Sequence, residues 1–168
     1  GVLVSGALRG VIFGLIPSLG LWPTRLPTWA QLLLALAIAD LGSYLTHVAT
    51  HKVSWLWPFH AIHHSARRLY WLNSTRMHPV DMASTLVISL APLALLGAPA
   101  PVLALFDAFA ITHLVLQHSN VRLRFGPLEH VIAGADFHRW HHSAVREEGE
   151  ANYASFFSLW DHVFRTFR

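Results

Sequence analysis

Four long apolar stretches divide this chain, and they restrict it to folds that hide extended runs of hydrophobic side chains from water. The stretches are Val2–Trp22, Trp29–Leu45, Met82–Leu96 and Pro101–Leu116. A helix that spans a bilayer needs about 20 predominantly apolar residues, and the last two stretches fall short of that length. A turn of glycine, alanine and proline at 97–101 separates them. This pattern predicts a tight helical hairpin, and two buried core helices of a soluble protein are the alternative.

The composition favours a lipid environment. Hydrophobic residues make up 54% of the 168 residues and charged residues 12%, whereas a typical soluble domain carries about 25% charged residues. The chain has no cysteine, which excludes disulfides, iron–sulfur clusters and thiolate metal sites. The first apolar stretch has no small-residue cleavage site after a basic start, so we do not interpret it as a signal peptide. Because the chain begins with Gly1 and not with Met, the sequence leaves open whether a segment precedes it.

Two polar regions, Thr46–Asp81 and Gln117–Arg168, follow the second and the fourth apolar stretch. They contain every histidine except His113 and ten of the twelve basic residues, and the net charge is +3. This distribution suits a membrane surface better than nucleic acid. Basic residues are enriched in the cytoplasmic loops of membrane proteins, so both regions are predicted to face the cytoplasm. An even number of spans lies between them, and they can therefore build one site together.

Thirteen histidines occur in this apolar chain, and eight of them form three boxes. The first box is an i, i+4 pair, and the other two are triplets at i, i+3 and i+4, spacings that place side chains on one side of a helix. Neutral imidazole binds iron, zinc, copper and nickel, and eight histidines are too many for one ion, so two metal ions are expected. His78 is a weaker candidate, whereas His130 and His162 are expected to make surface or local contacts. With a further pair at the end of the fourth stretch, the expected metal ligands are His47, His51, His60, His63, His64, His113, His118, His138, His141 and His142.

Two aspartates inside the apolar stretches are candidates for orienting these ligands. Metal-bound histidines usually donate their second N–H to a carboxylate or a carbonyl, and an acid within an apolar span indicates a functional site. Asp40 lies seven residues before His47, and Asp107 lies eleven residues before His118. Each aspartate is therefore predicted near the same helix face as its histidine. Helix packing or a helix-end position is the alternative for both.

In the order and spacing of its three boxes, the sequence resembles the fatty acid hydroxylase superfamily. That superfamily includes sterol desaturases, C-4 sterol methyl oxidases and related lipid hydroxylases. The segments around the boxes look similar as well, at 56–60, 76–79 and 117–120. Together the boxes and these segments are the specific part of the resemblance.

The tail of the chain supports the same resemblance. Residues 152–166 resemble the closing NYG…WDxxFGT segment of the family, although Ala154 and Arg165 stand where the family usually has glycine. These two departures lie outside the boxes and put the geometry of the tail in question rather than metal binding. The resemblance covers residues from about 30 to 168.

The resemblance implies an all-α integral membrane protein, with about four transmembrane helices and a cytosolic histidine-rich cap. It implies one membrane-embedded domain, 1–168, with histidine regions 46–81 and 113–168. Its centre would hold two iron ions, which zinc could replace in recombinant protein. The centre would use O2 and two electrons to hydroxylate or desaturate a lipid C–H bond. This sequence has no cytochrome b5-like or flavin segment, so a separate electron donor of the cytochrome b5, ferredoxin or flavin-reductase type is expected. The lipid itself is not readable.

Other histidine-rich proteins fit the sequence less well. A zinc metalloprotease needs a glutamate inside H-E-x-x-H, and none of the boxes has one. A bis-histidine haem protein for electron transfer would place its ligands on separate spanning helices. A metal transporter would line its spans with acids and histidines, and these spans are nearly bare. A carotenoid hydroxylase or ketolase uses the same chemistry, and it stays open beside the lipid hydroxylase.

Overall fold

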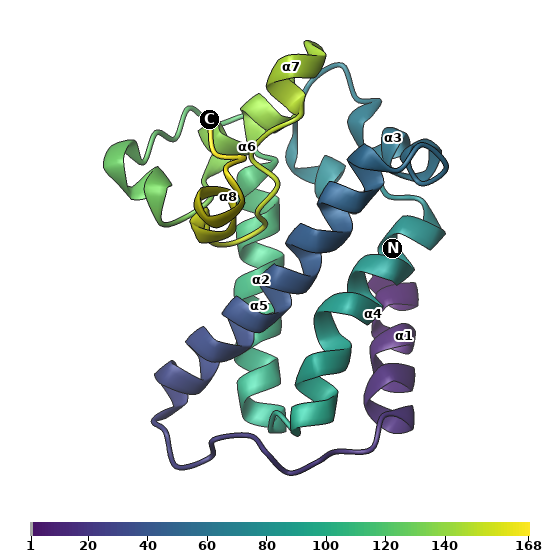
Figure 1. Cartoon of the computed structure of the whole chain (residues 1–168), viewed down its shortest axis with the longest axis vertical. Helices are drawn as coiled ribbons and strands as arrows, with labels where there is room; N and C mark the ends of the chain where they lie inside the picture. The colour runs from purple at the N-terminus through teal and green to yellow at the C-terminus, as the bar shows by residue number, and fades with distance from the viewer. Residues whose placement is uncertain (1) are drawn as a thin grey trace.

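The structure, a computed structural model, describes residues 2–168, with side chains from Gly6 onward, and this part of the chain is helical with no strand (Figure 1). The longer helices run side by side, and the short helices form a cap over one end of them. The elements in chain order are α1 (Val2–Leu15), α2 (Thr28–Lys52), α3 (Trp57–His64), η1 (Trp71–Thr75), α4 (Pro79–Leu96), α5 (Ala100–Gln117), η2 (Gly126–His130), α6 (Ala135–His141), α7 (Arg146–Gly149) and α8 (Leu159–Phe164).

Three helices of the described chain, α2, α4 and α5, are long and apolar enough to cross a membrane. The 25 residues of α2 extend over about 37 Å, and the 18 residues of α4 and of α5 extend over about 27 Å. The first apolar stretch forms a shorter helix, α1, which ends at Leu15, two residues before Pro17. A proline removes a backbone donor and restricts the residue before it.

The predicted hairpin is present between α4 and α5. Gly97 ends α4 with a φ of 84°, a left-handed conformation that glycine adopts without a steric cost. Pro99 and Pro101 then start α5, where a missing N–H is tolerated. The short connection holds α4 and α5 as neighbours and returns the chain to the cap.

Helices α2 and α4 approach each other closely at Gly42. A Cβ at this position would lie 2.7 Å from the carbonyl oxygen of Ile88 and 2.8 Å from the Cα of Ser89. The core beside this contact is formed by small and branched side chains, including the fully buried Ala35 and Leu93. Any larger residue at 42 would separate α2, which carries the first histidine box, from α4.

Asp40 is fully buried on α2, and its carboxylate binds the C-terminal segment. It accepts hydrogen bonds from the backbone N–H groups of Ser155, Phe156 and Phe157 at 3.0, 2.9 and 2.8 Å. We predicted from the sequence that Asp40 would orient a ligand histidine. The structure gives it a different contact, because its side chain meets the returning tail about two helical turns before His47.

Asp107, the other predicted orienting acid, forms an ion pair with Arg9 and connects α5 to α1. It lies in the first half of α5, far along the helix from His118. Within residues 2–168 the carboxylates of Asp40 and Asp107 make no hydrogen bond to any of the predicted ligand histidines, so both predicted contacts are wrong. Both aspartates serve packing between segments, which was the alternative that the sequence left open.

Replacing Asp40 by asparagine should destabilise the fold. The change removes the charge from an acceptor of three backbone hydrogen bonds, and a hydrogen bond to a charged group contributes about 1.5–3 kcal/mol. We expect Asp40→Asn to lower the free energy of unfolding by at least about 2 kcal/mol, measured by thermal unfolding in detergent. Asp107→Asn, on a partly exposed aspartate, is the matched control and should cost less. Equal stability of Asp40→Asn and the unchanged chain would contradict this role.

Candidate metal centre

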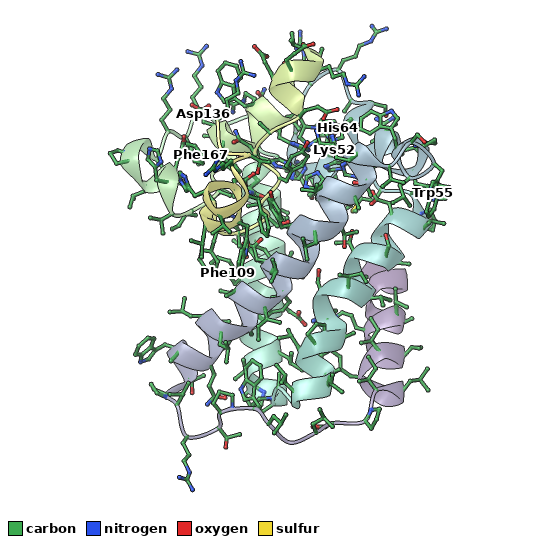
Figure 2. The ribbon with its side chains drawn as sticks, viewed as in Figure 1. Lys52, Trp55, His64, Phe109, Asp136 and Phe167 are labelled. Atoms are coloured by element: carbon green, nitrogen blue, oxygen red, sulfur yellow. The ribbon has the colours of Figure 1, made fainter. Side chains whose placement is uncertain are left out.

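Nine histidines converge where the cap meets the ends of α2 and α5. Figure 2 places His64 at this end, close to Lys52, with Phe109 further down among the long helices. The ring nitrogens form two groups, and within each group one nitrogen per residue lies within 4.8 Å of all the others. We call them the five-histidine cluster and the four-histidine cluster. The first comprises His47, His51, His60, His64 and His141, and the second comprises His63, His118, His138 and His142.

Each histidine triplet is divided between the two clusters. In the second box, His60 and His64 belong to the five-histidine cluster and His63 to the other; the third box has the reverse arrangement, with only His141 in the five-histidine cluster. The reason is helix geometry, because residues i and i+4 differ by about 40° around the axis, whereas i+3 points about 60° to the other side. The neighbouring rings of His63 and His64 accordingly lie at 85° to each other. The sequence predicted one face for all three histidines, and the structure shows two directions.

Hydrogen bonds at the outer nitrogens determine which way the lone pairs of several rings point. Nδ1 of His47 lies 2.7 Å from the carbonyl oxygen of Tyr153, Nδ1 of His141 lies 2.8 Å from that of Ala151, and Nδ1 of His118 lies 2.7 Å from that of Leu114. A carbonyl oxygen can only accept, so each Nδ1 carries the proton and donates. In the neutral ring Nε2 is then an unprotonated acceptor. These Nε2 atoms all face into the clusters.

The spacing of the inner nitrogens fits ligands that share an ion. Nε2 of His64 lies 3.2, 3.1 and 3.1 Å from Nε2 of His51, His60 and His141. One nitrogen cannot donate one proton to three partners, and facing lone pairs repel each other. Metal–imidazole bonds of about 2.1 Å at right angles to each other would place two nitrogens about 3.0 Å apart. The cluster therefore has the donor spacing that a bound cation requires.

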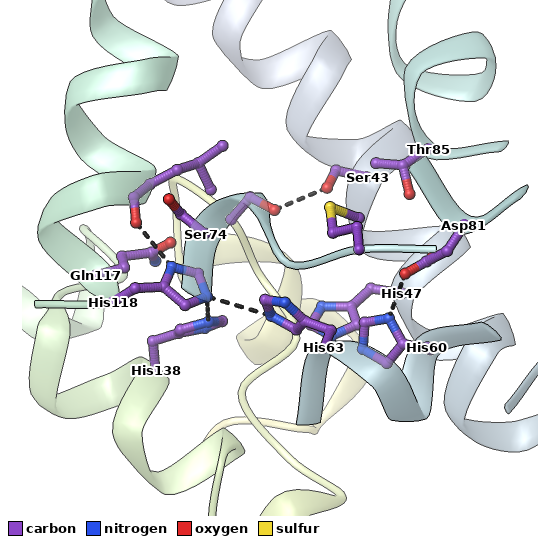
Figure 3. Close-up of a pocket in the computed structure, with 13 residues that line it drawn as sticks. Ser43, His47, His60, His63, Ser74, Asp81, Thr85, Gln117, His118 and His138 are labelled. Carbon is purple, nitrogen blue, oxygen red and sulfur yellow. Dashed lines mark hydrogen bonds and ion pairs between the residues drawn. The ribbon is translucent and has the colours of Figure 1, made fainter. Parts of the chain in front are cut away.

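The four-histidine cluster repeats this spacing. Nε2 of His118 lies 3.2 Å from that of His63 and 3.0 Å from that of His138 (Figure 3). Nε2 of His142 lies 3.1 Å from that of His138. The two clusters adjoin each other, because the rings of His64 and His142 stack with centroids 4.3 Å apart. Two cations held by these clusters would be close neighbours.

Burial keeps the imidazoles of the cap in the form that binds metals. Loss of hydration lowers the pKa of His118 to about 4, and loss of hydration together with the nearby His118 lowers the pKa of His142 to about 2. Burial and neighbouring imidazoles also lower the pKa of His63, His138 and His141 well below the ordinary value. Neutral histidine is the metal-binding form, so these residues are ready to bind at neutral pH.

Asp81 is the acidic partner that sequence reasoning missed. It lies in the first turn of α4 and is 2% exposed, and its Oδ2 is 2.9 Å from Nδ1 of His60 (Figure 3). A carboxylate behind an imidazole fixes the ring and increases its basicity. The available signal was the sequence His78-Pro79-Val80-Asp81, in which a proline and an acid indicate the start of a helix close to the second box.

The remaining histidines lie outside the two clusters. Nε2 of His113 lies 3.0 Å from the carbonyl oxygen of Ala133, and the ring of His113 stacks on Phe109. The side chain of His78 accepts the N–H of Val80 at the start of α4. His130 and His162 contact each other at 3.3 Å, in agreement with the local contacts predicted for them.

Two neighbouring cavities with shared lining residues adjoin the clusters. One, of about 110 Å³, is lined by histidines of both clusters, including His47, His63 and His118. The other, of about 290 Å³, lies between α2, α4 and α5 and is mostly apolar. Both are lined by Ser43 and Thr85, so the histidines face one end of an apolar chamber.

Single replacements should remove metal ions selectively. We expect His141→Ala to impair the five-histidine cluster and His138→Ala to impair the four-histidine cluster, each lowering the metal content from two ions toward one per chain. Elemental analysis of purified protein measures this. His162→Ala, which alters a histidine outside both clusters, is the control and should keep two ions.

A graded variant distinguishes ligands from the residues that orient them. Asp81→Asn keeps the side-chain shape and removes the charge behind His60, so it should weaken metal affinity by about 10- to 100-fold without removing a ligand. Full metal content in both alanine variants would contradict metal binding by the clusters.

Comparison with known proteins shows the family to which the chain belongs. The model of the fatty acid hydroxylase family matches residues 32–166. The chain is 40% identical over 146 residues to the ornithine lipid hydroxylase OlsE of Rhizobium tropici, with 87% of this chain and 44% of the relative covered. It is 33% identical over 140 residues to human alkylglycerol monooxygenase, with 83% of this chain and 30% of the relative covered.

A more distant relative is the cholesterol 25-hydroxylase of Rattus norvegicus, 26% identical over 156 residues, with 90% of this chain and 52% of the relative covered. The chain thus spans about half or less of the length of these relatives. No solved structure matches it. The family model covers most of the chain and all three histidine boxes, and the chain belongs to the fatty acid hydroxylase family.

Proposed function

We propose that this chain forms the catalytic part of a membrane-bound, non-haem di-iron oxygenase that hydroxylates a lipid. The observation that carries the proposal is the convergence of two clusters of inward-facing histidine nitrogens at one end of an apolar chamber. Metal ligands alone would also fit a storage site or a structural site. A chamber with mostly apolar walls beside the ligands additionally fits a hydrocarbon substrate.

The ligands proposed for the two ions are the nine histidines of the clusters. Imidazole suits iron as well as zinc, so zinc could occupy the site in recombinant protein. When bound, two iron ions would activate O2, and two electrons from outside the site would be consumed. The protein's own part is to hold the imidazoles neutral, through burial, and oriented, through Asp81 and the carbonyl oxygens of Ala151 and Tyr153. His113, predicted from the sequence as a ligand, would connect α5 to the cap through the carbonyl oxygen of Ala133 rather than bind metal.

The chamber would bind the lipid and exclude water from the reacting carbon. Its walls are contributed by the long helices, among them Leu86 and Leu90 of α4 and Phe106 of α5. A hydrocarbon chain in such a chamber loses contact with water, which is favourable by about 25 cal/mol per Å² of apolar surface. The same walls would limit water at the metals.

The relatives support a lipid as the substrate class. They are named for hydroxylation of ornithine lipid, monooxygenation of alkylglycerol and hydroxylation of cholesterol, three unrelated lipid skeletons. We therefore propose hydroxylation in preference to desaturation for this chain. The electrons would come from a separate donor protein.

We propose that the protein crosses the membrane with α1, α2, α4 and α5, as one domain, with the cap on the cytoplasmic side. Ten of the twelve basic residues lie in the two polar regions that form the cap, as the positive-inside rule requires. Trp29 and Trp55, near the two ends of α2, are 66% and 68% exposed. Exposed tryptophans are typical of the two membrane–water interfaces.

Lipid mass spectrometry tests the proposed activity. Cells that produce the protein should contain a lipid enriched by one oxygen atom, compared with cells that produce His141→Ala, because loss of one ligand disables the pair of ions. His162→Ala should give the same product as the unchanged protein. Identical lipid profiles with and without a metal-loaded, unchanged protein would exclude lipid hydroxylation in those cells.

A reporter fused after Arg168 tests the proposed topology. We expect a reporter that works only in the cytoplasm to be active, since the C-terminus lies in the cap (Figure 1). A second fusion in the loop between α1 and α2, at the opposite end of the helices, should give the reverse result. Activity of the C-terminal fusion only outside the cytoplasm would overturn the assignment.

A further inference from the structure

One hydroxyl group in the wall of the apolar chamber has unused hydrogen-bonding capacity. Ser89 of α4 lines the chamber and is 7% exposed. Its Oγ has no hydrogen-bond partner among the residues that the structure describes. A buried hydroxyl without a partner destabilises a fold, and such groups are rare in native proteins.

Three other hydroxyl groups in the long helices avoid this cost within their own helix. Thr46 donates to the carbonyl oxygen of Gly42 at 2.9 Å, Thr112 donates to that of Ala108 at 2.7 Å, and Ser84 donates to that of Asp81 at 2.9 Å. This local hydrogen bond is the ordinary solution for serine and threonine inside helices. Ser89 departs from it although it lies in the same kind of helix.

Thr85 lies one turn before Ser89, and Asp81, which binds His60, lies one turn before Thr85. The i, i+4 spacing places the three residues on one face of α4. With a rise of 1.5 Å per residue, Thr85 lies about 6 Å and Ser89 about 12 Å along the axis from Asp81. Thr85 lines both cavities and Ser89 lines the larger one, so their hydroxyl groups lead from the histidines into the chamber.

The other polar groups of the chamber are already engaged. Ser43 and Ser155 hydrogen-bond to each other at 2.7 Å, and Arg9 forms its ion pair with Asp107. The rest of the wall near Ser89 is hydrocarbon, including Leu86 and Leu90. A water molecule needs two to four polar partners to be held in a buried site, and an apolar wall offers few. A polar atom carried on an otherwise apolar ligand fits this surface better.

We propose that Thr85 and Ser89 bind a polar group within the lipid substrate, such as a hydroxyl, ester or amide, and so determine which carbon lies at the histidine clusters. This inference rests on the proposed function and names the class of lipid that the enzyme would oxidise. The substrate is an amphipathic lipid with a polar linkage a short distance from the oxidised carbon. The position of oxidation is then counted from that linkage and not from the methyl end of the chain.

Competitive lipid binding tests the proposal. Metal-loaded protein, kept without O2 and reductant so that no turnover occurs, is incubated with equal amounts of hexadecyl acetate and nonadecane, which match in length and differ in the ester. The bound lipids are quantified by mass spectrometry. The unchanged protein should prefer the ester, and the double variant Thr85→Val with Ser89→Ala should lose about tenfold of this preference, because two hydrogen bonds of about 0.5–1.5 kcal/mol each are removed.

Ser84→Ala is the matched control, since it removes a neighbouring hydroxyl of α4 that already has a partner, and it should keep the preference. An unchanged preference in the double variant, no preference in the unchanged protein, or an equal loss in Ser84→Ala would each overturn the proposal. The readout needs no product. Failure of the proposed oxygenase activity would instead appear as absent lipid oxidation with the ester preference intact.

Discussion

The structure depends on nine buried and half-buried imidazole rings whose inner nitrogens gather in two clusters. Unprotonated nitrogens that face each other repel unless a cation occupies the centre of each cluster, and four of the rings are held from behind by a hydrogen bond that fixes their direction. Asp81 holds His60, and backbone carbonyl oxygens hold His47, His118 and His141. The long helices contribute Asp81 and the carbonyl oxygen of Leu114, and the cap contributes the carbonyl oxygens of Ala151 and Tyr153.

The C-terminal tail links the fold to the site. Asp40 and Asp161 bind five consecutive backbone N–H groups of residues 153–157. The bond from Ala154 to Asp161 holds the peptide group whose carbonyl oxygen, that of Tyr153, orients His47. The carbonyl oxygen of Ala151, which orients His141, belongs to a peptide group whose N–H, on Asn152, donates to the carbonyl oxygen of Thr166. The departure from the family at Arg165 is accommodated, because Arg165 adopts a left-handed φ of 59°. Glycine reaches that conformation freely, whereas other residues pay roughly 1–2 kcal/mol for it. The tail thus keeps the turn despite the changed residue.

Much of the site could be predicted from the sequence, because histidine spacing along a helix is local information. The boxes, the hairpin and the exclusion of His130 and His162 follow from such patterns. Helix geometry already separates the i+3 and i+4 directions, but the division of each triplet between two clusters was missed, because the partners of each direction are supplied by other helices. The partners of Asp40 lie more than a hundred residues away, and the side chain of Asp81 meets His60 through a loop whose path no periodicity determines.

The most direct test of this account is the location of the metals in the purified protein. Diffraction data collected at the iron absorption edge, from crystals of protein loaded with iron, should give two anomalous peaks per chain. One should lie among His47, His51, His60, His64 and His141, and the other among His63, His118, His138 and His142. A single peak, or peaks outside these two groups of histidines, would contradict the two-cluster assignment.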